Sequence, residues 1–235
     1  MLPPLDDLAG FGLAWARVMP AVTIVPAFGL RALPAAARGV LGLALAAAIY
    51  PSVVPVVIAE RATPWFVLAL EQMVLGLPVA LAAAIPLWAA TMAGGLVDAL
   101  RGSPDGAGLA TVEGRPSSFG VLLSLFASVV FLATGGAARA ASALARVELP
   151  GHPLLAAAND IVAGIGLAVA LGGPILAAAV VLELAFALVA RAASPAQVHA
   201  LLAPLRALGL LAIVAVVMER LATLVATATR SAIPL

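Results

Sequence analysis

The chain has 235 residues, of which 64% are hydrophobic and 10% charged, and its mean hydropathy is +1.19. This composition excludes a water-soluble globular protein and indicates a polytopic membrane protein with an all-α fold. The 12 basic residues, all arginine, nearly balance 11 acidic ones, which excludes a nucleic-acid-binding surface, and the absence of cysteine excludes disulfides and thiolate metal sites.

Apolar runs long enough to cross a bilayer occur along most of the chain. We therefore predict that residues 1–235 form one integral-membrane domain. The runs predict about six to eight kinked helices, with segments near residues 9–30, 39–59, 65–93, 119–144, 154–190 and 205–229. Pro20 predicts a kink in the first segment, and Pro51 predicts that the regular helix of the second ends near Tyr50.

The fifth apolar run, residues 154–190, is too long for one straight span of the hydrocarbon core. Two arrangements fit it: a hairpin that turns at Gly172 to Pro174, or one helix that extends out of the membrane. The arginines divide too evenly between the two sides of a six-span arrangement to orient the chain.

The central connection, residues 98–118, is the longest polar stretch between apolar runs. A loop of this length in an otherwise apolar protein is either functional or an ordinary extramembrane connection. Its glycines allow close approaches, and its small polar surface would suit a wet lumen. The residues that we expect to act in a gate are Arg101, Gly102, Ser103, Pro104, Asp105, Gly106, Gly108, Glu113, Gly114 and Arg115.

Ionisable side chains inside the apolar runs are costly in a membrane and need a partner or water. They are Arg17, Glu71, Asp160, Glu183, Glu219 and Arg220. We expect them at helix or subunit contacts rather than in a proton relay, since no two of the acids have helical i, i+4 spacing. Glu219 and Arg220 are neighbours in sequence and cannot face each other, so each needs its own partner.

The sequence lacks the metal-binding, phosphate-binding and nucleophile motifs for which we searched. The two histidines, His152 and His199, lack metal-ligand spacing, and neither a phosphate-binding G-x-x-x-x-G-K-[ST] loop nor a G-x-S-x-G elbow occurs. We therefore expect no enzyme, no metal and no cofactor.

Three stretches, residues 16–55, 94–136 and 171–214, together resemble the FliR/SctT family of bacterial type III secretion, which includes HrcT-, YscT- and EscT-like proteins. The first has an arginine in its helix (Arg17) and a Pro34 turn followed by a basic residue. The second has a glycine-rich helix end, a polar loop and a leucine-rich helix. The third resembles the family's Ala-Pro helix start, its R-x-x-P-Q style connection and its Pro-Leu-basic entry into the last helix. Glu183 departs from the asparagine that the family often has.

The resemblance implies an export-gate subunit of the bacterial inner (cytoplasmic) membrane. It would form a gated channel for unfolded proteins with FliP/SctR- and FliQ/SctS-type subunits, next to FlhB/SctU- and FlhA/SctV-type proteins, and its loop near 101–118 would plug the closed channel. The alternative is a self-contained small-solute transporter, which would need inverted repeats around a central site. Whether the apparatus is flagellar or an injectisome stays open.

Overall fold

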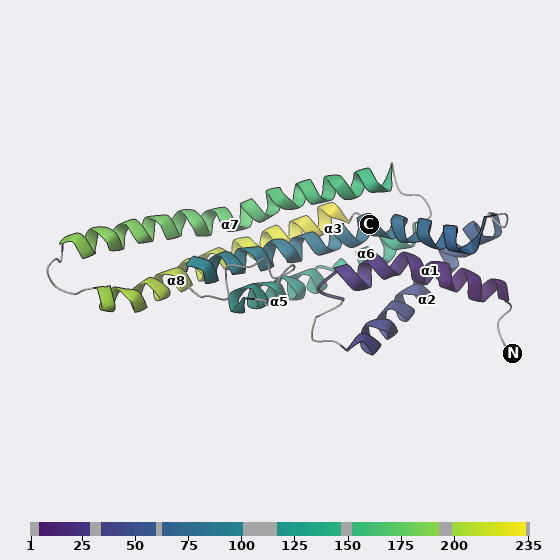
Figure 1. Cartoon of the computed structure of the whole chain (residues 1–235), viewed down its shortest axis with the longest axis horizontal. Helices are drawn as coiled ribbons and strands as arrows, with labels where there is room; N and C mark the ends of the chain where they lie inside the picture. The colour runs from purple at the N-terminus through teal and green to yellow at the C-terminus, as the bar shows by residue number, and fades with distance from the viewer. Residues whose placement is uncertain are drawn as a thin grey trace. The chain divides into compact units, whose positions relative to one another are not determined.

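The computed structural model describes residues 5–28, 34–59, 63–100, 117–146, 152–192 and 199–233. Within these ranges all regular elements are α-helices (Figure 1). The seven helices are α1 (Leu5–Ile24), α2 (Ala35–Ala59), α3 (Trp65–Leu100), α5 (Ser118–Ala133), α6 (Gly136–Leu144), α7 (Pro153–Ala192) and α8 (His199–Ala232). The predicted all-α fold is confirmed.

Several of these helices are long and apolar enough to cross a membrane. The candidate spans are Ala36–Val53, Trp65–Leu100, Pro153–Ala192 and Pro204–Ala232. A fifth span results if α5 and α6, which are bent by 68°, count as one. The bend lies at Gly135, whose positive φ of 77° is readily adopted only by glycine. The prediction of a polytopic membrane protein is confirmed.

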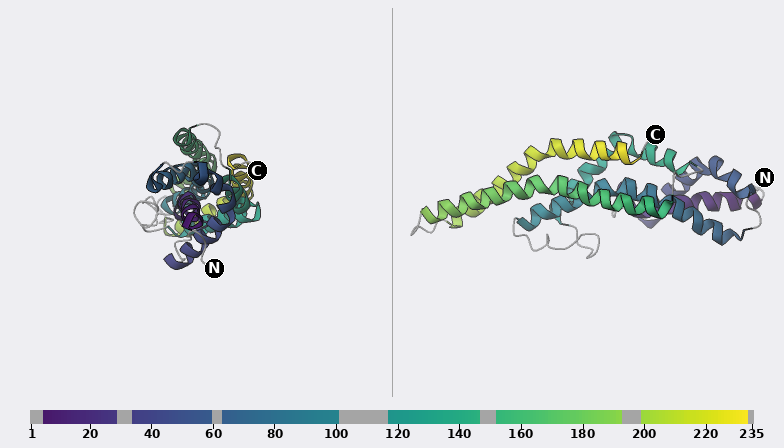
Figure 2. Two further views of the ribbon diagram at one scale, coloured as in Figure 1. Left: turned by 90° about the vertical axis from the view of Figure 1, so that its right-hand side faces the viewer. Right: turned by 90° about the horizontal axis from the view of Figure 1, so that it is seen from above.

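Helix α7 settles the choice between a hairpin and one long helix. It is continuous for 40 residues through Gly172, Gly173 and Pro174 (Figure 2). At 1.5 Å per residue it is about 60 Å long, roughly twice the thickness of a hydrocarbon core. A proline removes one hydrogen bond from a long helix, whereas a reverse turn would leave several backbone groups without partners in apolar surroundings. Continuity is therefore the less costly arrangement.

The expectation that the second helix ends near Tyr50 is wrong, because α2 continues past Pro51 to Ala59. Pro51 and Pro55 have no N–H to donate, yet the helix continues through both positions. The Ser52 hydroxyl donates to the carbonyl oxygen of Ile49 at 2.6 Å, which adds a side-chain bond beside the interruption. Helix α3 likewise extends beyond its predicted segment, to Leu100, so Asp98 belongs to the helix and not to the following connection.

The chain forms two compact units, each built from parts of several helices. The first comprises residues 1–87, 128–164 and 226–235, and the second comprises residues 88–127 and 165–225. In the first unit α1 packs against α2 (Figure 1), and the rings of Phe11 and Tyr50 lie 6.2 Å apart. The indole N–H of Trp65 donates to the carbonyl oxygen of Ala9 at 3.2 Å, which joins the starts of α3 and α1.

Candidate functional site

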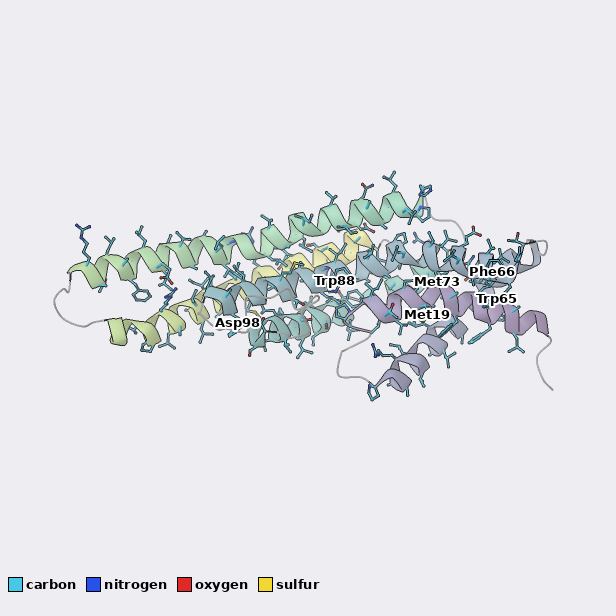
Figure 3. The ribbon with its side chains drawn as sticks, viewed as in Figure 1. Met19, Trp65, Phe66, Met73, Trp88 and Asp98 are labelled. Atoms are coloured by element: carbon cyan, nitrogen blue, oxygen red, sulfur yellow. The ribbon has the colours of Figure 1, made fainter. Side chains whose placement is uncertain are left out.

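The predicted gate residues from Arg101 to Arg115 lie outside the described residues, but both ends of their connection are described. Asp98 lies near the end of α3 (Figure 3). Its side chain is buried, with an exposed fraction of 2%. Its Oδ2 accepts a hydrogen bond of 2.7 Å from the backbone N–H of Phe119, in the first turn of α5. The first N–H groups of a helix have no partner inside the helix and favour a negative charge. Asp98 therefore joins the end of α3 to the start of α5.

A second cap lies beside this bond. The hydroxyl oxygen of Ser117, the residue before α5, accepts from the backbone N–H of Gly120 at 3.0 Å. This is the usual geometry of a serine N-cap, which satisfies another free donor of the first turn. The sequence offered a signal for Ser117, a serine at the start of an apolar run, but gave no signal that Asp98 would reach across to Phe119.

Helices α3 and α5 meet backbone to backbone at these caps. A Cβ atom on Gly94 would collide with the carbonyl oxygen of Phe119 and would lie 2.6 Å from the Cα of Gly120. Since Asp98 follows Gly94 by four residues, it lies on the same face of α3 and reaches the same turn of α5. We call Gly94, Asp98, Ser117, Phe119 and Gly120 the neck.

An arginine from α8 fixes the last turn of α3. Arg206 donates through Nη2 to the carbonyl oxygen of Leu100, the last residue of α3, at 3.4 Å. The same guanidinium forms an ion pair with Glu183 of α7. A cation at the C-terminal end of a helix interacts favourably with carbonyls that have no partner in the helix. The helix before the predicted gate residues is thus fixed by α5 on one side and by α8 on the other.

Two further arginines also donate to carbonyl oxygens at helix ends. Arg17, which is 2% exposed, donates through Nη1 to Leu144, the last residue of α6, at 3.3 Å and to Arg146 at 3.1 Å. Arg139 donates to Ile233, just after α8, at 3.3 Å. A guanidinium suits this role because it carries several donors in a rigid plane. Arg17, Arg139 and Arg206 therefore all bind carbonyl oxygens at or next to the C-terminal ends of helices.

We expect that Arg17→Leu lowers the stability of the protein strongly. The substitution leaves the carbonyls of Leu144 and Arg146 without this donor, and for the buried carbonyl of Leu144 the loss costs about 1–3 kcal/mol. The measurement is the thermal midpoint of the detergent-solubilised protein, followed by size-exclusion chromatography. Arg191→Leu, which removes an exposed arginine at the end of α7, is the control and should leave the midpoint unchanged. Equal midpoints for both variants would contradict the capping role of Arg17.

The six predicted intramembrane charges have different environments. Arg17 is held by the end of α6, and Glu183 is paired with Arg206. Glu71 is exposed on α3 and interacts electrostatically with Arg17, and Asp160 is half-buried on α7. Glu219 and Arg220 are exposed on α8. In the described part of the chain, neither side chain of this last pair has a hydrogen bond or an ion pair.

Comparison with known proteins gives two findings. The family model described as bacterial export proteins, family 1, matches residues 8–232. The secretion system apparatus protein SsaT of Salmonella typhimurium (strain LT2) is 40% identical over 73 residues, which make up 31% of this chain and 28% of that protein. The chain thus matches less than a third of the length of this relative.

The family match includes parts of all seven described helices and of both units. Together with the apolar helices, it supports a component of a bacterial secretion apparatus that crosses the inner membrane more than once. The resemblance seen in residues 16–55, 94–136 and 171–214 is confirmed. The chain belongs to bacterial export proteins, family 1, the FliR/SctT family.

Proposed function

We propose that this chain is the FliR/SctT-type subunit of a type III secretion export gate. With FliP/SctR- and FliQ/SctS-type subunits it forms a gated channel that passes unfolded proteins across the bacterial inner membrane, and FlhB/SctU- and FlhA/SctV-type proteins dock on the assembly. The observation that carries the proposal is the family match over residues 8–232. We propose that the chain has a structural and not a catalytic role, in keeping with a family of export proteins.

The exposed apolar surface of α7 supports a role in an assembly. Large hydrophobic side chains are exposed along the whole helix: Leu154, Leu155, Ile161, Val162, Ile165, Val169, Leu176, Val180, Val181, Leu184, Leu188 and Val189. Because the helix is about 60 Å long and a hydrocarbon core about 30 Å thick, lipid around a perpendicular span covers only about half of this surface. Neighbouring subunits would cover the rest.

The neck supports the assignment of the gate to residues 101–118. Its contacts hold the end of α3 next to the start of α5, so the connection between them begins and ends at one place. A segment held at both ends can fill a pore without being carried away by a passing substrate. The glycines at 102, 106, 108 and 114 allow backbone conformations that suit close packing in a lumen. We assign to this segment the plug of the closed channel.

Co-purification tests the proposed assembly. The tagged chain is expressed with the FliP- and FliQ-type proteins of the same organism, and the detergent-solubilised complex is weighed by native mass spectrometry. We expect one mass that contains this chain with several copies of each partner. The chain expressed alone is the control, and we expect it to aggregate because its apolar faces stay uncovered. A stable monomer or homo-oligomer that ignores both partners would contradict the proposal and favour a self-contained transporter.

A further inference from the structure

One face of α8 combines an apolar strip with two charges. Val216 is 81% exposed, the largest exposed fraction of any large hydrophobic side chain in the described residues. Glu219, Arg220 and Thr223 follow at three, four and seven residues, so all four side chains lie on one face of the helix, and all are exposed. Leu205 and Leu208 extend the exposed apolar surface toward the start of α8. We call Val216, Glu219, Arg220 and Thr223 the α8 face.

No described residue of the chain pairs with either of the two charges of the α8 face. Consecutive residues point in different directions around a helix, so Glu219 and Arg220 cannot pair with each other. The Thr223 hydroxyl donates to the backbone carbonyl of Glu219 at 3.0 Å and leaves the carboxylate unbound. In contrast, Arg206, at the start of the same helix, is paired with Glu183. Among the described residues, α8 therefore has a paired charge toward α7 and unpaired charges on its exposed face.

Neither lipid nor water suits this face. It lies within the candidate span Pro204–Ala232, where ionised side chains facing lipid are costly and are normally paired or in a water-filled cavity. Water would solvate Glu219 and Arg220 but would leave Val216, Leu205 and Leu208 exposed. A second helix with an apolar surface and two opposite charges satisfies both parts of the face.

We propose that the α8 face binds a membrane-embedded helix of another export-apparatus subunit, which places a basic group against Glu219 and an acidic group against Arg220. The inference rests on the proposed function and names the surface through which this chain joins the assembly. Because the two charges lie at opposite edges of this one face, a partner helix fits in only one order of charges. The pair thus selects the orientation of the partner as well as binding it.

Exchange of the two residues tests the order of the charges. The double variant Glu219→Arg with Arg220→Glu keeps the composition and net charge of α8 but opposes like charges across the contact. We expect at least about 30-fold less complex per membrane-inserted chain when it is co-expressed with FliP- and FliQ-type subunits, as for a broken buried charge pair. The control exchanges two exposed, uncharged neighbours outside the α8 face, Ser231→Ala with Ala232→Ser, and should stay within about twofold of the original chain.

Cross-linking tests the occupant directly and is independent of the stability of the exchange variant. Since the chain contains no cysteine, Val216→Cys provides its only thiol, to which a photoreactive maleimide is attached in membranes that hold the complex. We expect adducts with one co-expressed subunit, identified by mass spectrometry. Adducts with lipid alone, or an exchange variant that assembles as well as the original chain, would overturn the inference. If the original chain itself forms no complex, the proposed function fails instead.

Discussion

Deletion of Gly102 to Gly114 is expected to make membranes that contain the assembled gate leaky to ions and small solutes. If this segment fills the closed pore, its removal leaves an open lumen in an assembly whose helices are otherwise unchanged. The deletion keeps Asp98, Leu100 and Ser117, so the contacts of the neck and of Arg206 remain available. We expect conductance to rise on the order of tenfold or more in planar bilayers, because a closed pore conducts almost nothing.

Two controls separate a plug from a disturbed assembly. The same deletion in the chain expressed without FliP- and FliQ-type subunits should not leak, since no shared pore exists there. A glycine-serine segment of the same length, placed between Arg101 and Arg115, shows whether bulk alone closes the pore or the original side chains are needed. If the deleted gate assembles fully and its conductance is unchanged, residues 101–118 do not form the plug.

The positions of most helices follow from the apolar runs, but the behaviour of their prolines does not. Proline and glycine at 172–174 are strong local signals for a turn, yet α7 passes through them. The same holds for Pro51 in α2. The sequence signal reflects the one hydrogen bond that a helix loses at a proline. A turn in apolar surroundings would cost more free energy, because it would leave several backbone groups without partners. In very apolar chains the second cost decides.

Only part of the candidate site could be predicted from the sequence, because its contacts join residues that are far apart along the chain. The length and polarity of residues 98–118 predicted a loop there, but Asp98, which appeared to begin that loop, is a buried residue of α3. Its role depends on the N-terminus of a helix that begins at Ser118. Likewise, Arg17 and Arg206 are recognisable as costly charges, but the carbonyls that they bind belong to helix ends far away in sequence. Such partners become visible only when the helices are packed.

In the neck, Gly94→Ala is expected to destabilise the protein, although alanine favours a helix more than glycine does. The added Cβ has no space, because it would collide with the carbonyl oxygen of Phe119 and lie 2.5 Å from the carbonyl carbon. Helix α5 would have to shift away, which weakens the 2.7 Å bond between Asp98 and the Phe119 N–H. Overpacking of a tight contact costs about 1–3 kcal/mol, and loss of a hydrogen bond to a charged group about 1.5–3 kcal/mol.

The adjacent glycine provides a matched control. A Cβ on Gly95 would meet only the Ser117 hydroxyl oxygen, at an ordinary contact distance of 3.7 Å. Gly95→Ala should therefore be neutral or should stabilise α3 by about 0.5–1 kcal/mol, the usual gain for glycine to alanine within a helix. The two variants differ by one position: Gly94→Ala is expected to lower the thermal midpoint of the detergent-solubilised complex, whereas Gly95→Ala should leave it unchanged or raise it. Equal shifts would mean that α3 and α5 do not meet at Gly94. A decrease for Gly94→Ala alone would establish the backbone contact that holds both ends of the connection together.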